Sequence, residues 1–313
     1  MTRFWPHRRV LVTGGHGFLG SFLLESLEAS GCQEVAAPGR ASCDLTDVDA
    51  VRRLFSDFRP QVVFHLAASV GGIQANRLQP GRFFQENLTM GIYLIHEAMK
   101  AGVEKFVQVG TVCSYPKHTP VPFRESDLWN GFPEETNAAY GIAKKALLVQ
   151  LQAYRDQYGL NGIYLIPTNL YGPRDNFDLS TSHVIPALIR KCLEANGAGK
   201  VAVWGTGKAT RDFLFVRDCA QALVAAAERY NGPGPLNLGS GREVAISELA
   251  STVARLTGFE GELEFDPSYP DGQPRRVLDS SRARAAFGFH PKTGFEEGLR
   301  ETVSWYLEHR EAS

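Results

Sequence analysis

The sequence predicts an α/β fold in which a doubly wound parallel sheet is followed by a smaller α/β domain. Short apolar runs alternate with longer amphipathic runs along the first half of the chain, which is typical of strands and the helices that cover them. A glycine-rich turn joins the first apolar run, 10–13, to the helical stretch 18–30. After residue 168, glycine, proline and asparagine become more frequent and the elements shorten. We therefore expect two domains, at 1–168 and 169–313.

Each element of the first domain has its own signal. A short apolar run predicts a buried strand at 10–13, and further short strands are expected at 34–37, 62–66, 105–110 and 162–167. Longer periodic runs predict helices at 18–30, 80–102 and 138–158. The helix at 80–102 begins with a proline and ends with a glycine, the residues preferred at those two ends. Strands and helices in this order build one parallel sheet with helices on both faces.

The second domain is predicted to contain shorter elements. Helices are expected at 182–196, 216–229, 246–257 and 294–308. In the last of them, Phe295, Leu299 and Val303 recur every four residues and form one apolar stripe. The run 211–216 is expected to be a strand, and it is a candidate to join the sheet of the first domain.

The composition excludes several classes of function. Lysine and arginine number 33 and aspartate and glutamate 34, so the net charge is −1. We expect no nucleic-acid partner, because such proteins need a basic surplus or stripe. The five cysteines contain no C-x-x-C pair, which argues against a disulfide framework and a metal site. No apolar run of 18 residues and no signal-peptide pattern is present, so we expect a cytoplasmic protein without a membrane partner.

The glycine-rich turn predicts a dinucleotide site. Gly14, Gly17 and Gly20 form G-x-x-G-x-x-G directly after the first strand, and Phe18 and Leu19 begin the following helix. Glycine lets the backbone approach a pyrophosphate, and the N–H groups at the start of the helix bind its oxygens. This is the arrangement of a Rossmann-like domain.

The end of the second strand indicates the type of cofactor. An acidic residue there usually binds the ribose hydroxyls of NAD. This chain has Arg40 instead, which suits the 2′-phosphate of NADP(H). Asp44 follows shortly afterwards, and it either contacts the adenine amine or caps the helix that starts near Asp47.

A tyrosine and a lysine predict chemistry on a carbonyl group. Tyr140 and Lys144 are four residues apart in the helix at 138–158, so their side chains share one face. We expect the lysine ammonium to lower the pKa of the tyrosine, which would make it an acid or base near neutral pH. Thr111 closes the preceding strand, and its hydroxyl can hold a substrate carbonyl.

These features, taken in order along the chain, resemble the extended short-chain dehydrogenase/reductase family. Asp44-Leu45 and His65-Leu66-Ala67-Ala68 add to the match. In that family the hydroxyl, the tyrosine and the lysine form the catalytic triad. Longer blocks resemble, more narrowly, the GDP-L-fucose synthases of this family. These blocks lie at 69–73, 111–117, 167–173, 182–188 and 270–279.

The narrower resemblance implies an NADPH-dependent enzyme that epimerises GDP-4-keto-6-deoxy-D-mannose at carbons 3 and 5 and reduces its ketone. The 4-ketone acidifies the hydrogens on both neighbouring carbons, and inversion needs a base on one face and an acid on the other. In the family a cysteine and a histidine do this, which here are Cys113 and His183. A nearby cation such as Lys144 would favour the cysteine thiolate, and an imidazolium would return the proton.

The resemblance also implies further binding residues and an assembly. Besides the glycine turn, Arg40 and Asp44, the residues assigned to the cofactor are Leu45, Leu66, Ala67, Tyr140, Lys144, Pro167, Asn169, Leu170 and His183. Those assigned to the GDP-sugar are Asn169, Val184, Leu188, Lys191, Trp204, Arg211 and Arg276. Trp204 is expected to stack on the guanine or shield the sugar, and the two arginines to bind the diphosphate. A homodimer is expected through the helices at 80–102 and 138–158.

Three alternatives stay open on the sequence alone. One is a nucleotide-sugar epimerase that releases no reduced product, although Arg40 disfavours its usual cofactor, NAD. Another is an enzyme that epimerises one carbon only, or that acts on a different 4-keto sugar such as a deoxyheptose. The last is a cofactor-binding regulator without catalysis, which would have no need of Thr111, Tyr140 and Lys144.

Overall fold

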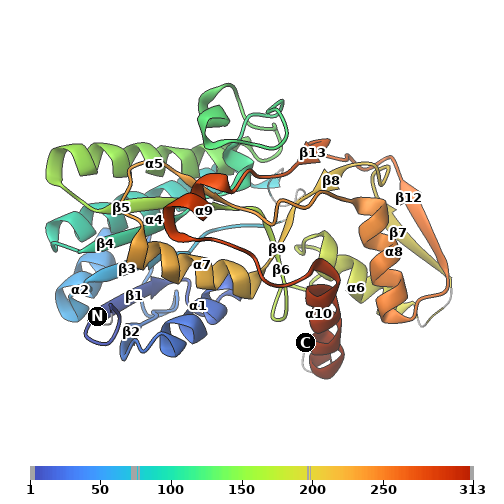
Figure 1. Ribbon diagram of the computed structural model, residues 1–313, viewed down its shortest axis with the longest axis horizontal. Helices are drawn as coiled ribbons and strands as arrows, with labels where there is room; N and C mark the ends of the chain where they lie inside the picture. The colour runs from blue at the N-terminus through green and yellow to red at the C-terminus, as the bar shows by residue number, and fades with distance from the viewer. Residues whose placement is uncertain (1–3, 72–75, 77, 196, 198, 311–313) are drawn as a thin grey trace.

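A six-stranded, all-parallel sheet forms the centre of the computed structural model (Figure 1), which describes residues 4–71, 76, 78–195, 197 and 199–310. The strand order is β10-β5-β4-β3-β1-β2. The strands are β1 (Arg9–Thr13), β2 (Glu34–Ala36), β3 (Val62–His65), β4 (Lys105–Val109), β5 (Gly162–Pro167) and β10 (Leu236–Leu238). The predicted α/β parallel sheet is confirmed.

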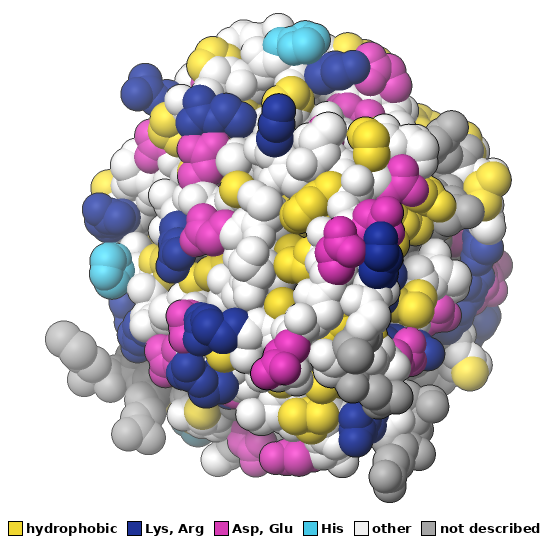
Figure 2. Space-filling model, turned by 90° about the vertical axis from the view of Figure 1, so that its right-hand side faces the viewer, with side chains coloured by type: hydrophobic (Ala, Val, Ile, Leu, Met, Phe, Trp, Pro, Cys, Tyr) yellow, Lys and Arg dark blue, Asp and Glu magenta, His cyan; other side chains and the backbone are white. Residues whose placement is uncertain are grey.

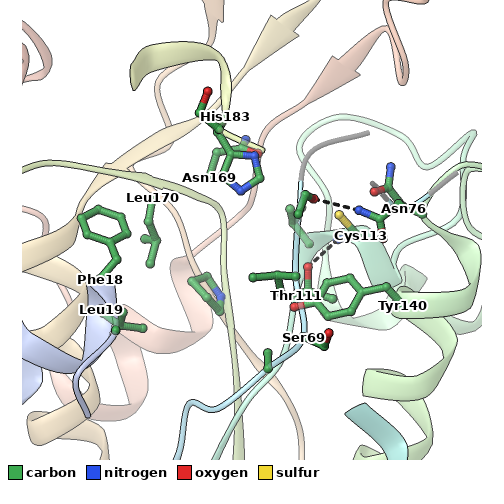
Figure 3. A pocket seen from close by; sticks show the side chains of 18 of the residues that line it. Phe18, Leu19, Ser69, Asn76, Thr111, Cys113, Tyr140, Asn169, Leu170 and His183 are labelled. Carbon is green, nitrogen blue, oxygen red and sulfur yellow. Dashed lines mark hydrogen bonds between the residues drawn. The ribbon is translucent and has the colours of Figure 1, made fainter. Parts of the chain in front are cut away.

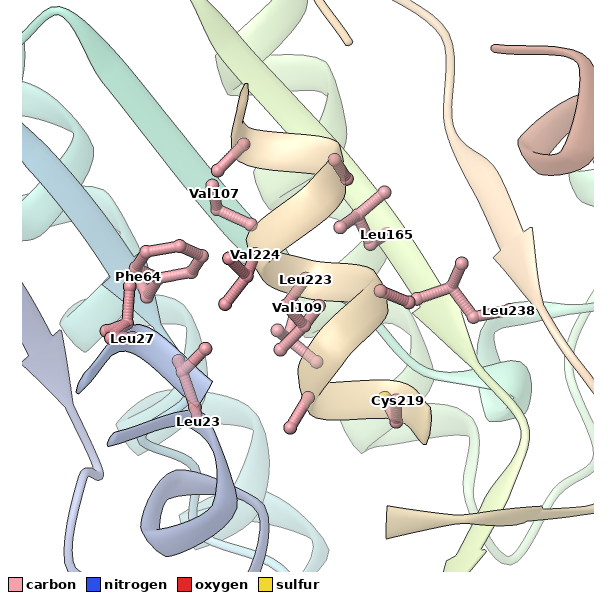
Figure 4. Packing of buried hydrophobic residues seen from close by; sticks show 14 of the residues in the cluster. Leu23, Leu27, Phe64, Val107, Val109, Leu165, Cys219, Leu223, Val224 and Leu238 are labelled. Atoms are coloured by element: carbon pink, nitrogen blue, oxygen red, sulfur yellow. The ribbon is translucent and has the colours of Figure 1, made fainter. Parts of the chain in front are cut away.

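Helices cover both faces of this sheet (Figure 1). One face carries α2 (Val48–Phe58), α4 (Pro80–Lys100) and α5 (Ala138–Tyr158), and the other carries α1 (Phe18–Ala29), α7 (Val216–Arg229) and α9 (Ser281–Phe287). Successive strand residues point to opposite faces, so Val10 and Val12 join one core and Leu11 the other. Figure 4 shows α7 packed on the sheet, with Leu223 and Val224 among the side chains of the core.

The predicted strand at 211–216 does not join this sheet. Its ordered part, β9 (Phe213–Phe215), pairs instead with β6 (Asn169–Tyr171) in a separate two-stranded sheet. The strand that joins the main sheet is β10, which lies beside β5. The helix α7 lies between β9 and β10 in the chain, so it is the crossover that returns the chain to the sheet. Residues beyond 168 therefore contribute to the first core as well as to the second.

A second unit packs around its own core, on the right in Figure 1. It contains α6 (Val184–Glu194), α8 (Ile246–Thr257) and α10 (Phe295–His309), and the strands β7 (Lys200–Trp204), β8 (Thr210–Arg211), β11 (Val244–Ala245), β12 (Glu262–Asp266) and β13 (Arg275–Arg276). Figure 2 shows the outer face of this unit, where side chains of both charges are interspersed. Among the ion pairs of this unit, Arg255 and Glu296 lie 2.9 Å apart. No helix in the described part of the chain has the length and apolar character that a membrane crossing requires.

Candidate active site

A cavity of about 1080 Å³ lies where the carboxyl ends of the parallel strands meet the second unit. This is the edge at which open α/β sheets bind their ligands. Every site residue expected from the sequence lines this one cavity. They are Gly14, Gly17, Phe18, Leu19, Gly20, Arg40, Asp44, Leu45, Leu66, Ala67, Thr111, Cys113, Tyr140, Lys144, Pro167, Asn169, Leu170, His183, Val184, Leu188, Lys191, Trp204, Arg211 and Arg276.

The glycine turn forms a cradle that only small residues can build. Gly14 has a φ of +74°, and a Cβ there would lie 2.7 Å from the backbone nitrogen of Ala67. A Cβ on Gly20 would overlap the carbonyl oxygen of Gly14. The residue that precedes α1, Gly17, offers no side chain to cap it, so the first N–H groups of α1, beside Phe18, are free to meet an anion. The turn therefore fits the pyrophosphate of a dinucleotide.

Arg40 and Asp44 lie in the segment between β2 and α2, and both line the cavity. The Arg40 side chain is 70% exposed, and its Nη2 lies 4.0 Å from the Glu86 carboxylate. Asp44 accepts hydrogen bonds from the backbone N–H and the hydroxyl of Thr46, at 2.9 and 2.7 Å. The cap of α2 is Asp47, which accepts from the N–H of Asp49. Asp44 thus holds a turn rather than capping the helix, and its contact with adenine stays a prediction.

The catalytic trio comes together from two elements. Thr111 follows β4, while Tyr140 and Lys144 lie one turn apart on α5. The hydroxyls of Thr111 and Tyr140 share a hydrogen bond. Gly141 permits this approach, because a Cβ there would overlap the carbonyl oxygen of Cys113. Figure 3 shows Thr111, Cys113 and Tyr140 side by side on one wall of the cavity.

We expected Lys144 to lower the pKa of Tyr140, and for the protein without ligands this prediction is wrong. Burial raises the pKa of this phenol above its ordinary value, and the charge of Cys113 raises it further, while the hydrogen bond with Thr111 opposes both effects. Burial also lowers the pKa of Lys144 to about 8. Removing both groups from water outweighs any attraction between them. Tyr140 therefore carries its proton at neutral pH and is ready to donate it.

Cys113 and His183 lie on different walls of the cavity (Figure 3). Cys113 belongs to a short 3-10 helix, η1 (Val112–Ser114), and its N–H donates to the Thr111 hydroxyl at 3.2 Å. The cation in contact with its sulfur is Arg276, whose Nη1 lies 3.9 Å away. We expected Lys144 in that place, but the cation that contacts the sulfur is Arg276, while Lys144 is buried on α5.

His183 precedes α6 and points into the cavity (Figure 3). Burial lowers the pKa of its imidazole, and the charge of Arg276 lowers it further. Without a bound anion the ring is therefore neutral at neutral pH, and the expected imidazolium is not its resting form. An anion beside Arg276 would offset that charge and favour protonation.

Arg211 and Arg276 are paired residues of the neighbouring strands β8 and β13, and both line the cavity. Arg211 donates to the carbonyl oxygens of Thr210, Asp271 and Gln273, at 2.8, 2.8 and 2.6 Å. Burial, and next the charge of Arg276, lower the pKa of Arg211 to about 9. Within the described ranges neither guanidinium has a carboxylate within ion-pair distance. Two adjacent cations without a counter-charge suit a diphosphate.

Three other residues that we expected to bind the substrate also make contacts within the protein. Asn169 donates its amide to the carbonyl oxygen of Asp212 at 2.9 Å, so it also holds β6 to β9. The Trp204 ring stacks on Tyr269, with centroids 4.3 Å apart and planes 2° from parallel. The Lys191 ammonium lies 5.5 Å from the centroid of the same tryptophan ring. The contact between Trp204 and guanine stays a prediction.

The residues that line the cavity but were not singled out from the sequence include His16, Asn137 and Gln273. His16 lies between the glycines of the motif, and Asn137 precedes α5 by one residue. Gln273 lies within the block 270–279, where only Arg276 was singled out. Position within a matching block was the one available signal for it. Part of the block 69–73 falls outside the described residues.

The comparisons with known proteins agree with this geometry. The family model described as "NAD dependent epimerase/dehydratase family" matches residues 10–239. The chain belongs to this family. GDP-L-fucose synthase of Sinorhizobium fredii is 44% identical over 302 residues, which cover 96% of each chain. A GDP-L-fucose synthetase from Naegleria fowleri, crystallised with NADP, superposes with a TM-score of 0.90 at 30% identity and covers 98% of this chain and 96% of that one.

Another solved relative is named for a substrate other than that of the GDP-L-fucose synthases. The GDP-6-OMe-4-keto-L-xylo-heptose reductase of C. jejuni superposes with a TM-score of 0.93 at 28% identity, covering 98% of this chain and 99% of that one. Among the described residues, no group of three or more His, Cys, Asp or Glu side chains is placed to hold a metal ion.

Proposed function

We propose that this protein is a GDP-L-fucose synthase, which converts GDP-4-keto-6-deoxy-D-mannose to GDP-L-fucose by epimerisation at carbons 3 and 5 and NADPH-dependent reduction at carbon 4. The observation that supports this most directly is that one cavity holds both sets of groups. Thr111, Tyr140 and Lys144 suit reduction of a ketone. Cys113, on the same wall as Thr111 and Tyr140, and His183, on a different wall, suit removal and return of a proton. The identity to curated GDP-L-fucose synthases supports the same substrate.

In this proposal epimerisation precedes reduction, because the hydrogens on carbons 3 and 5 are acidic only while carbon 4 is a ketone. Thr111 and Tyr140 hold the ketone oxygen, which stabilises the enolate that forms when Cys113 removes a proton. The substrate diphosphate lies on Arg211 and Arg276, so it raises the proton affinity of His183, which returns a proton on the other face. While Cys113 is negative, its charge keeps the proton on Tyr140. That phenol donates to the ketone oxygen in the reduction step.

The cofactor residues fit NADP(H). The glycine cradle takes the pyrophosphate, and Arg40 supplies the cation that a 2′-phosphate needs. When bound, the nicotinamide supplies the hydride for carbon 4.

Arg40→Ala should weaken NADPH binding by about tenfold or more and leave NADH binding within about twofold, because a charged hydrogen bond contributes about 1.5–3 kcal/mol. Cofactor fluorescence titration of the two nucleotides measures both constants. Arg59→Ala, on the far side of α2, is the matched control. Equal losses for NADPH and NADH would assign Arg40 a role other than binding the phosphate.

The proposed activity is tested by mixing the protein with NADPH and enzymatically prepared GDP-4-keto-6-deoxy-D-mannose, with the product identified by NMR. Stoichiometric NADPH oxidation with formation of GDP-L-fucose is the expected result. Deuterium uptake from heavy water without oxidation would instead indicate an epimerase without the reductive step.

Reduction of a different GDP-4-keto sugar is the second candidate. The high structural similarity to a GDP-heptose reductase favours it, although Cys113 and His183 give this chain both groups that epimerisation needs. The same assay with a GDP-4-keto-heptose distinguishes the two, since a heptose enzyme would oxidise NADPH faster with that substrate than with the deoxymannose.

We also propose a homodimer formed through α4 and α5. These helices pack closely, because Gly91 leaves room for Leu147. Phe84 and Ile92 on α4 and Val149 on α5 are exposed apolar side chains. A two-fold symmetric copy would cover this face.

The protein is also proposed to work in a reducing compartment such as the cytoplasm. The observation that supports this is that the five cysteines are all unpaired.

The double variant Ile92→Glu, Val149→Glu should lower the molar mass measured by light scattering from that of two chains to that of one. The introduced glutamates would face those of the other copy across the two-fold axis. Their mutual repulsion and the cost of removing them from water would both destabilise the dimer. Leu307→Glu on α10, where the leucine is also exposed, is the control and should leave the mass unchanged. A dimer that persists in the double variant would contradict this interface.

A further inference from the structure

We propose that Arg276, held in place by Gln273, is a positioning residue for Cys113 and stabilises its thiolate during proton removal. The inference rests on the proposed function, in which Cys113 is the base. It gives Arg276 a role besides diphosphate binding, and it gives Gln273, which the sequence reasoning passed over, a role of its own.

The contact between Arg276 and Cys113 is specific in geometry. Nη1 of Arg276 lies 3.9 Å from Sγ of Cys113, which is within hydrogen-bonding range for sulfur. Nε of the same guanidinium donates to Oε1 of Gln273 at 3.2 Å. The planar guanidinium is therefore held at two of its nitrogens, and its orientation toward the sulfur is fixed.

Both the nitrogen and the oxygen of the Gln273 side-chain amide form hydrogen bonds within the protein. It is 3% exposed, and its Nε2 donates to the carbonyl oxygens of Pro116 and Lys117, at 3.2 and 2.8 Å. These two carbonyls belong to the loop that leaves η1, so Gln273 joins the loop before β13 to the segment that carries Cys113. Its backbone carbonyl accepts from Arg211 at 2.6 Å, which holds the glutamine from the other side.

Burial makes this contact effective. Arg276 is 8% exposed and has no carboxylate partner within the described ranges, so its charge is not offset by a neighbouring anion. The charge of Cys113 also acts on Arg211 and on the Tyr140 phenol. Nη1 and Nη2 of Arg211 donate hydrogen bonds to backbone carbonyl oxygens and not to the sulfur. The phenol carries no positive charge. Arg276 is thus the cation aimed at the sulfur.

The test measures alkylation of Cys113 by iodoacetamide as a function of pH in the full-length protein, without sugar substrate. The thiolate is the reactive form, and the other four cysteines are buried, so the native protein reports on Cys113. A change in access alters the plateau rate, whereas a loss of thiolate stabilisation moves the midpoint of the pH profile. The midpoint therefore decides.

Arg276→Met should move this midpoint up by about one pH unit, which is about a tenfold loss of thiolate at a given pH below it. Gln273→Leu should move it in the same direction by less, because the charge stays but loses its anchor. The double variant should match Arg276→Met, since Gln273 acts through Arg276. Arg275→Met is the control: Arg275 is exposed and pairs with Glu243 at 2.6 Å, so its loss should leave the midpoint in place.

An unchanged midpoint in Arg276→Met, together with weaker GDP binding by calorimetry, would overturn the proposal and leave Arg276 as a diphosphate ligand only. Effects of the two single variants that add in the double variant would also overturn it, because they would place Gln273 outside this chain of contacts. Neither measurement needs the sugar substrate. Failure here is therefore distinguishable from failure of the proposed reaction.

Discussion

Tyr140→Phe should lower the rate of ketone reduction by about a hundredfold or more, because a positioned acid contributes about 10²–10⁴-fold to a proton transfer. The phenol is placed against Thr111, and burial keeps it protonated at neutral pH. Phenylalanine preserves the ring and its packing but has no proton to give. NADPH oxidation followed at saturating substrate measures the effect on kcat.

The same variant should bind GDP with nearly unchanged affinity, because the groups proposed to bind the diphosphate are Arg211 and Arg276 and not Tyr140. Tyr154→Phe is the matched control. Tyr154 lies on the same helix, outside the cavity, and its hydroxyl forms a hydrogen bond with His96 at 3.0 Å. The Tyr154→Phe variant should therefore reduce the ketone at the normal rate. Reduction by Tyr140→Phe within about threefold of the unmodified enzyme would remove Tyr140 as the acid.

Cys113→Ser should suppress exchange of the protons on carbons 3 and 5 with heavy water, again by about a hundredfold or more. A serine hydroxyl is a far weaker acid than a thiol, so it supplies almost no anionic base near neutral pH. The exchange is followed by NMR in the presence of NADP⁺, which keeps the ketone from being reduced. Epimerisation is thereby measured separately from reduction.

NADPH binding should be preserved in Cys113→Ser, because the glycine cradle and Arg40 are untouched. Cys32→Ser, whose buried sulfur lies near the start of the sheet and outside the cavity, controls for the loss of a thiol elsewhere. Exchange at the normal rate in Cys113→Ser would identify another group as the base. His183 would then be examined first, since its resting imidazole is neutral and can accept a proton.

The first half of the fold was predictable from local sequence. Strands β1, β3, β4 and β5 of the main sheet are short, largely apolar and buried runs, whereas β2 is an exposed edge strand of three residues. Helix α5 occupies the predicted span 138–158. Buried parallel strands need apolar side chains on both faces, so their position in the chain is marked clearly. The glycines of the turn were equally clear, because Gly14 and Gly20 occupy places where no Cβ fits.

The pairing of the short later strands was not predictable. β9 and β10 have three residues each, too few for a pattern that distinguishes one sheet from another. Their partners depend on where α7 returns the chain, which is a property of the packed core. The elements β8, β11 and β13, of two residues each, leave no signal in the sequence.

By itself the sequence determined the fold class, the NADP-type cradle and the identity of the groups that meet in the cavity, because each depends on residue type at a fixed spacing. Tertiary structure decided how those groups are charged. Burial raises the pKa of Tyr140 and lowers those of Lys144 and His183, against the expectation that the lysine would activate the tyrosine. It also placed Arg276, which is distant from Cys113 in the sequence, against the sulfur, and Gln273 against Arg276 and the loop that follows Cys113. Desolvation and contacts between distant segments exist only once the chain has packed, and for that reason no local pattern reveals them.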